Sequence, residues 1–156
     1  MNIDIICVGK LKEKFFRDAC AEYEKRLLAY CKIQITELAE TPVSSDGEIP
    51  RALESEGAKI LAKIPKDVYI ICMCVEGKNI SSEELSSHIS ELKCRGKSRI
   101  CVIIGGSNGI CADIKKRADF RLSMSKMTFP HHLARVMILE QIYRAFKIEE
   151  GASYHK

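Results

Sequence analysis

Long apolar runs are missing from this 156-residue sequence: none approaches the roughly 20 residues that a membrane-spanning helix needs. The first residues, MNIDIICVGK, include Asp4 and lack both a basic start and a small-residue cleavage site, so we expect no signal peptide and a cytoplasmic protein. Internal repeats and low-complexity tracts are also missing. Hydrophobic residues make up 46% and charged residues 29% of the chain, which predicts one globular domain over residues 1–156.

Metal-binding and disulfide patterns are missing as well, despite eight cysteines. No two cysteines have the C-x-x-C spacing of zinc ribbons and thioredoxin-type sites. Neither H-x-x-x-H nor H-E-x-x-H occurs among the four histidines, so the sequence offers no motif for metal-dependent hydrolysis. Six cysteines lie at apolar strand-like or helix-like positions, namely Cys7, Cys20, Cys31, Cys72, Cys74 and Cys101. We therefore expect reduced cysteines that pack as small hydrophobic residues, and no bound metal.

Common phosphate-binding motifs are missing too, although residues 99–110, RICVIIGGSNGI, run from a strand into a glycine-rich loop. No Gly-Lys-Ser/Thr closes the loop, which argues against a Walker A nucleotidase. The spacing is not G-x-G-x-x-G, and Asp119 lies only 14 residues after Gly105, closer than the interval of about 20 usual for a ribose-binding acid. A nicotinamide dehydrogenase stays an alternative.

Charge is unevenly distributed along the chain. Residues 1–89 hold 12 Lys and Arg against 15 Asp and Glu, whereas residues 90–156 hold 13 against 6. A basic half favours an anionic partner, with nucleic acid as the leading candidate, and a solvated basic surface is the alternative. The candidate phosphate contacts form two clusters: Lys115, Lys116, Arg117 and Arg121, and Lys93, Arg95, Lys97 and Arg99.

Apolar periodicity predicts alternating strands and helices. Strands are expected over 3–8, 32–38, 68–75, 99–104 and 119–124, and the alternating pattern of 32–38 places it near an edge of the sheet. Helices are expected over 11–30, 51–64, 81–96, 110–117 and 131–148, and 41–50 is expected to be a surface loop. This order predicts a parallel α/β sheet with helices on both faces.

The last expected helix, residues 131–148, is apolar around most of its circumference. One sheet does not cover that much apolar surface, so we expect homodimerisation through this helix. The alternative is a helix buried wholly within its own subunit.

Three loops are expected to meet at the carboxyl end of the sheet, where α/β proteins bind ligands: 73–78, 105–109 and 123–132. The hydroxyls of Ser125 and Thr128 and the ring of Phe129 suit a purine nucleoside, and few charged groups are present for phosphates. This pattern favours an adenosine-like cofactor over a triphosphate.

The strings IGGSNG, LSMSKMTFPH, RVMILEQIYRAFKI and YHK, in this order, resemble the RlmH family of SPOUT-class methyltransferases. VGKLKEKFFRDACAEYEKRL and EGKNISSEEL extend the likeness over nearly the whole chain. The resemblance implies a homodimer that uses S-adenosyl-L-methionine to methylate N3 of a pseudouridine in 23S ribosomal RNA, the large-subunit RNA of the assembled ribosome. It also implies a deep trefoil knot in the C-terminal part of the fold.

Site residues follow from the same resemblance. The implied cofactor contacts are Met73, Gly105, Met124, Ser125, Lys126, Met127, Thr128 and Phe129. The implied catalytic residues are His155 and Tyr154, in a tail directed toward the partner subunit's cofactor site, with Lys156 or Arg135 stabilising negative charge. Rival interpretations are a dinucleotide oxidoreductase and a ribosome-associated factor without enzymatic activity.

Overall fold

The structure is a computed structural model that describes residues 1–151. Within them, parallel strands form one sheet in the order β2-β1-β4-β3-β5. The strands are β1 (Asn2–Val8), β2 (Lys32–Leu38), β3 (Tyr69–Asn79), β4 (Arg99–Ile104) and β5 (Phe120–Ser123). The helices are α1 (Lys14–Leu27), α2 (Ile49–Leu61), α3 (Ser82–Cys94), α4 (Ala112–Arg117) and α5 (His131–Glu149), with a 3₁₀ turn at Asp46–Glu48. The predicted parallel α/β fold is confirmed, whereas the knot stays a prediction.

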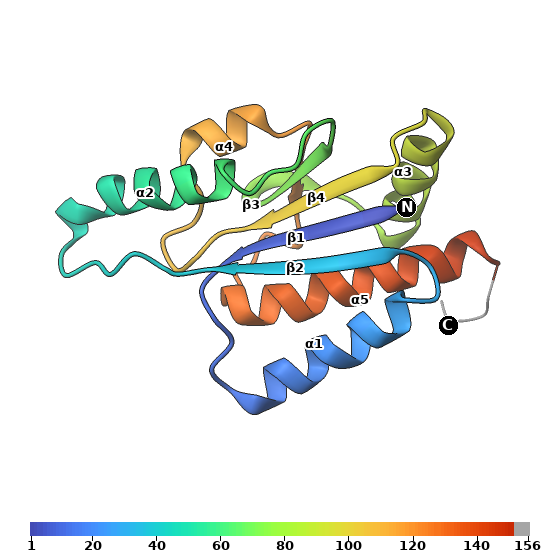
Figure 1. Cartoon of the computed structure of the whole chain (residues 1–156), viewed down its shortest axis with the longest axis horizontal. Helices are drawn as coiled ribbons and strands as arrows, with labels where there is room; N and C mark the ends of the chain where they lie inside the picture. Colours follow the sequence, from blue (N-terminus) through green and yellow to red (C-terminus); the bar gives the residue numbers. More distant parts are fainter. Residues whose placement is uncertain (152–156) are drawn as a thin grey trace.

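Helices cover both faces of the sheet (Figure 1). On β1, Ile3 and Ile5 pack into a hydrophobic core with residues of α1, α3 and α5. Ile6 and Val8 point to the opposite face and pack with Ile60 of α2 and residues of α4. This alternation is the period of two expected for a strand, and the burial of both faces explains why β1, β3 and β4 are apolar along most of their length.

Local sequence signals set several element boundaries. A capping box begins α3: the Ser81 hydroxyl accepts a hydrogen bond from the Glu84 backbone N–H at 3.2 Å, and the Ser81 N–H donates to the Glu84 carboxylate at 2.7 Å. The predicted start of α1 at Leu11 is wrong. Gly9 has a φ of +95°, and the guanidinium of Arg17 donates to the Leu11 carbonyl at 3.2 Å, so a non-helical loop precedes α1.

Strand β3 is longer than predicted and is interrupted. Both Met73 and Lys78 pair with Leu122 of β5, so residues 74–77 loop out between two paired stretches. A Cβ on Gly77 would lie 2.7 Å from the Leu122 carbonyl carbon, and glycine therefore allows the strand to approach β5 closely. The interruption carries the side chains of residues 74–76 to the carboxyl end of the sheet.

Helix α5 is flanked by α1 and α3, not by the sheet alone (Figure 1). The sequence argument counted only the sheet as cover within the subunit, whereas α1 and α3 also pack on this helix and much of its apolar surface is buried within the subunit. Its buried residues are Arg135, Ile138, Leu139, Ile142, Ala145 and Phe146. Leu133, Val136 and Met137 are only partly buried, so an apolar strip of α5 remains accessible.

All eight cysteines are free, and five of them are buried, which confirms their expected role as small hydrophobic residues. Among residues 1–151, no three His, Cys, Asp or Glu side chains are grouped as metal ligands would be. Over the same residues, every helix is too short or too polar to cross a membrane.

Candidate cofactor site

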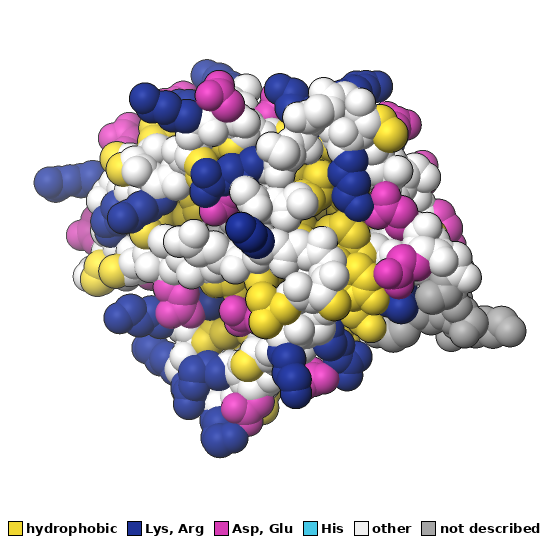
Figure 2. Space-filling model, turned by 45° about the vertical axis from the view of Figure 1, so that its right-hand side comes forward, with side chains coloured by type: hydrophobic (Ala, Val, Ile, Leu, Met, Phe, Trp, Pro, Cys, Tyr) yellow, Lys and Arg dark blue, Asp and Glu magenta, His cyan; other side chains and the backbone are white. Residues whose placement is uncertain are grey.

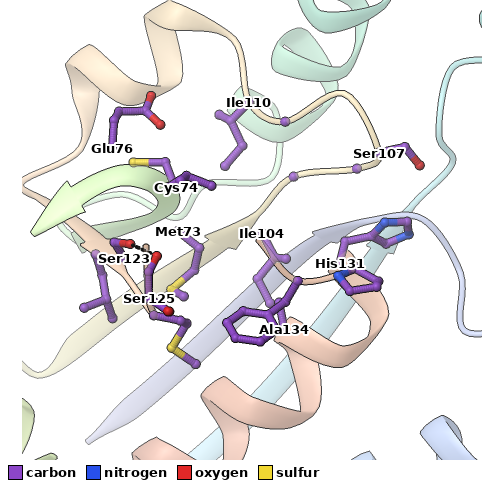
Figure 3. Close-up of a pocket in the computed structure, with 18 of the residues that line it drawn as sticks. Met73, Cys74, Glu76, Ile104, Ser107, Ile110, Ser123, Ser125, His131 and Ala134 are labelled. Atoms are coloured by element: carbon purple, nitrogen blue, oxygen red, sulfur yellow. Dashed lines mark hydrogen bonds between the residues drawn. The ribbon is translucent and has the colours of Figure 1, made fainter. Parts of the chain in front are cut away.

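A pocket of about 470 Å³ lies at the carboxyl end of the sheet (Figure 3). Its walls come from the interruption of β3, the glycine loop that follows β4, and the segment between β5 and α5. These are the three segments that the sequence predicted to meet, and the structure confirms that they do. The volume falls in the range of small-molecule sites, roughly 300–1,000 Å³.

The structure places most of the expected cofactor contacts in this pocket. The residues that line it are Met73, Gly105, Met124, Ser125, Met127 and Phe129. Lys126 and Thr128 are exposed and do not line it. His155 and Tyr154, expected to be catalytic, and Lys156 lie outside the described residues.

The glycine loop closes on itself. The Gly109 N–H donates to the Gly106 carbonyl at 3.1 Å, and Gly109 has a φ of +88°, a conformation that other residues rarely adopt. A Cβ on Gly105 would collide with the Gly109 carbonyl and lie 2.6 Å from Cγ1 of Ile110. The turn itself therefore requires glycine at position 105.

Glu40, which follows β2, holds the glycine loop from outside and was missed in the sequence. Its carboxylate accepts a hydrogen bond from the Ser107 N–H at 2.8 Å. Burial raises the pKa of Glu40, but the hydrogen bonds from Ser107 and the nearby His131 and His132 outweigh it, so the pKa is below its ordinary value. No local sequence signal links these residues, because Glu40 and Ser107 are 67 positions apart.

Residues 105–109 also have the G-x-S-x-G spacing of an esterase nucleophile elbow, and the structure does not support that chemistry. The partner of Ser107 is the Glu40 carboxylate, through both its backbone and its side chain. An esterase serine needs a histidine base within hydrogen-bond reach, and no described residue supplies one.

The segment between β5 and α5 is shaped by its own serines. The Ser123 hydroxyl donates to the Ser125 carbonyl at 2.9 Å, and the Met127 N–H donates to the Ser125 hydroxyl oxygen at 3.0 Å. Figure 3 shows Ser123 and Ser125 facing Met73 and Cys74 across the pocket. Met127 and Val75 are 72% and 56% exposed although both line the pocket, which leaves apolar surface for a ligand to cover.

The charged lining of the pocket is neutralised. Lys115 is the only Lys or Arg among the described lining residues, and its Nζ lies 2.5 Å from the Glu76 carboxylate. The hydrogen bond from Lys115 lowers the pKa of Glu76, so that side chain is a carboxylate at neutral pH. A nucleoside therefore fits this site better than a ligand with several phosphates.

Two basic side chains near the pocket are engaged elsewhere. Arg135, expected as one of two groups that stabilise negative charge, is 1% exposed, forms an ion pair with Glu37 and donates to the Gly9 carbonyl at 2.8 Å. That expectation is wrong, since its charge is already satisfied. His131 lines the pocket, but its Nε2 is buried against Gly9, and burial lowers the pKa of the ring below its ordinary value.

Asp119, considered as a ribose-binding acid, has a structural partner. Its carboxylate accepts a hydrogen bond from the Ile70 backbone N–H at 2.7 Å, and it does not line the pocket. The structure therefore removes the acidic residue on which a dinucleotide site would depend.

Comparisons with known proteins agree with this geometry. The model of the family described as "Predicted SPOUT methyltransferase" matches residues 1–155. The protein named Ribosomal RNA large subunit methyltransferase H of Clostridium novyi (strain NT) is 50% identical, and the protein of that name in Clostridioides difficile (strain 630) is 46% identical, each over 100% of both chains. The solved structure of a probable methylase family protein from Haemophilus influenzae Rd KW20 aligns with a TM-score of 0.56 at 14% identity, covering 99% of this chain and 70% of that chain.

The structural likeness concerns the fold alone, whereas the sequence matches span the chain. Because the family model matches nearly the whole chain and the relatives are about 50% identical, this chain belongs to the SPOUT methyltransferase family.

Proposed function

We propose that this methyltransferase transfers the methyl group of S-adenosyl-L-methionine to N3 of a pseudouridine in large-subunit ribosomal RNA. Ribosomal RNA is the substrate named for the relatives of about 50% identity. The observation that carries the proposal is one pocket in which six of the implied cofactor contacts converge from three separate segments.

The residues present fit a nucleoside cofactor. Met73 and Phe129 offer apolar surface to a purine ring, and Gly105 and Gly106 bring backbone to the pocket wall. The ion pair between Glu76 and Lys115 leaves the described lining without a net positive charge that would repel a sulfonium. When bound, S-adenosyl-L-methionine supplies a methyl group on that sulfur atom.

The chain's own contribution is to align the acceptor and to remove its proton. Holding N3 in line with the methyl group supplies much of the rate by positioning. N3 of pseudouridine carries a proton, so a base or an anion-stabilising group is needed as well. We assign that role to His155 and Tyr154, as the family resemblance implies; among the described lining residues, Glu76 is paired with Lys115 and His131 has its Nε2 buried.

A homodimer through α5 completes the proposal. Val136 and Met137 line a second hollow of about 440 Å³ together with Tyr23 of α1 and Leu85 of α3. Figure 2 shows a continuous band of hydrophobic side chains open on one face of the molecule. A second copy would cover the apolar strip of α5 and bring its C-terminal tail to the candidate cofactor pocket.

Met137→Glu tests the dimer by analytical ultracentrifugation. The variant should sediment as a monomer, because a charge would be placed in the apolar strip. Leu28→Glu is the matched control, since Leu28 is 68% exposed and lies outside α5. A dimeric Met137→Glu protein would contradict an interface through this helix.

Transfer of a labelled methyl group to purified ribosomes that lack the modification tests the activity. The wild-type protein should label one large-subunit pseudouridine, and His155→Ala should lower the rate about 10²- to 10⁴-fold while S-adenosyl-L-methionine affinity is unchanged. Cys94→Ser is the control, because Cys94 is exposed on α3 and does not line the pocket. Absence of labelled RNA with the wild-type protein would refute the proposal.

A further inference from the structure

Four aromatic rings form a continuous row from the start of α1 to the candidate cofactor pocket. Ring centroids are 4.4 Å apart for Phe15 and Phe16, 5.9 Å for Phe16 and His132, and 3.8 Å for His132 and His131. His131 lines the pocket, whereas Phe15, at the other end of the row, is 65% exposed. The row therefore joins an open aromatic surface to the site.

Packing of α1 accounts for Phe16 but not for Phe15. Phe16 lies four residues before the buried Cys20, on the face that α1 turns to the core, and it is half-buried. Phe15 lies off that face, so its ring is not needed to fill the core. An isolated exposed hydrophobic residue is ordinary, but this one extends a row of rings that ends at a binding site.

Three lysines lie close to Phe15 in the sequence. Lys10, Lys12 and Lys14 are all exposed, and Glu13 and Asp18 are the acids in the same stretch. Lys14 pairs with Asp18, whereas no carboxylate of the described residues forms an ion pair with Lys10 or Lys12. Figure 2 shows Lys and Arg side chains gathered along the lower edge of the molecule, where Figure 1 places α1. The start of α1 therefore combines one exposed ring, Phe15, with two lysines, Lys10 and Lys12, that form no ion pair among the described residues.

We propose that Phe15, Phe16 and His132 form a stacking platform for unpaired bases that flank the methylated nucleotide, with Lys10 and Lys12 contacting their phosphates. Unpaired bases expose flat faces that stack on aromatic side chains, and phosphates complement the lysines. The inference rests on the proposed function for its RNA substrate, and it assigns the path by which that RNA reaches the pocket.

Substitutions of Phe15 test the platform by ribosome binding. Phe15→Ala and Phe15→Leu should each weaken binding about 5- to 100-fold, because loss of one stacked base typically costs that much. Phe15→Trp should bind as tightly as the wild type, since it keeps a stacking face. All three should retain the wild-type affinity for S-adenosyl-L-methionine and the wild-type sedimentation coefficient, and Leu28→Ala, equally exposed at the far end of α1, should bind ribosomes normally.

Three results would overturn the platform. Normal binding by Phe15→Ala would show that the ring contacts no RNA, and normal binding by Phe15→Leu alone would reveal apolar contact without stacking. A changed sedimentation coefficient would instead identify an interface between copies of this chain. Because binding is measured apart from methyl transfer, an inactive wild-type protein that still binds ribosomes through Phe15 would refute only the proposed activity. A wild-type protein that binds no ribosomes would refute both proposals.

Discussion

The Glu40 carboxylate accepts a hydrogen bond from the Ser107 backbone N–H at 2.8 Å and so joins the chain after β2 to the glycine loop after β4. A Cβ on Gly106 would lie 2.9 Å from the same carboxylate, which shows how closely the two segments pack. Ser107 and Gly106 both line the pocket. The shape of the cofactor site thus depends on a residue that does not line it.

Glu40→Gln should lower the affinity for S-adenosyl-L-methionine about 5-fold and the free energy of unfolding by about 1 kcal/mol, because a neutral amide accepts a weaker hydrogen bond than a carboxylate. Isothermal titration calorimetry and urea unfolding measure the two effects. Glu54→Gln, on the exposed side of α2, is the control and should change neither quantity. An unaltered cofactor affinity in Glu40→Gln would contradict the coupling.

Stability should depend on pH through the same carboxylate. Because the folded pKa of Glu40 is below its ordinary value of 4.5, ionised Glu40 stabilises the fold above that pH, and the stabilisation is lost as pH falls through the folded pKa. The difference in unfolding free energy between wild type and Glu40→Gln should therefore be constant above about pH 5 and shrink below pH 4.5. A difference that grows on acidification would contradict the assignment.

Gly105→Ala should distort the glycine loop. The added Cβ would meet the Gly109 carbonyl and lie 2.6 Å from Ile110, so we expect a loss of about 1–3 kcal/mol of stability and weaker cofactor binding. Gly47→Ala is the matched control, since nothing lies within 4 Å of its Cβ position. Thermal unfolding with and without S-adenosyl-L-methionine measures both effects, and equal behaviour of the two variants would contradict the described turn.

Arg135→Met should destabilise the fold by about 2–4 kcal/mol, because the Gly9 carbonyl would lose its buried donor and the partly exposed Glu37 its ion-pair partner. Lys116→Met, at a side chain 80% exposed, should change the stability by less than about 0.5 kcal/mol. Urea unfolding compares them. A loss below about 1 kcal/mol for Arg135→Met would show that the ion pair contributes little.

Thiol reactivity should separate the cysteines by burial. Burial raises the pKa of Cys7, Cys72 and Cys101 to about 12, whereas Cys94 is exposed. A thiol reagent at pH 8 should modify Cys94 quickly and reach the other three only on unfolding. Since the unfolded thiols ionise near pH 9 and the folded ones do not, stability should fall as pH rises above 9. Rapid modification of Cys7, Cys72 or Cys101 in the folded protein, located by peptide mass spectrometry, would contradict this assignment.

Apolar periodicity was enough to predict which segments are strands and which are helices, because the residues of β1, β2 and β4 each show a strand pattern within the segment itself. The bounds of Arg99–Ile104 and Lys32–Leu38 agree with the prediction. The strand order did not follow, since it depends on pairings between residues distant in sequence. The surroundings of α5 were missed for the same reason: its apolar circumference gives no sign of whether α1 and α3 or a second subunit covers it.

The site was partly predictable. Loops after parallel strands meet at one end of a sheet, which placed Met73, Gly105 and Phe129 together. The contribution of Glu40 was not predictable, because a half-buried acid in a surface segment resembles any solvated carboxylate. The interruption of β3 was hidden as well, since Cys74 and Val75 continue the apolar strand pattern although they lie in the interruption.

Calorimetric titration of the purified protein with S-adenosyl-L-methionine, and separately with NADH, tests the central claim most directly. The account predicts saturable binding of S-adenosyl-L-methionine, reduced in Gly105→Ala but not in Gly47→Ala, and no binding of NADH. Binding of NADH alone, or S-adenosyl-L-methionine binding that Gly105→Ala leaves intact, would contradict the assignment of this pocket.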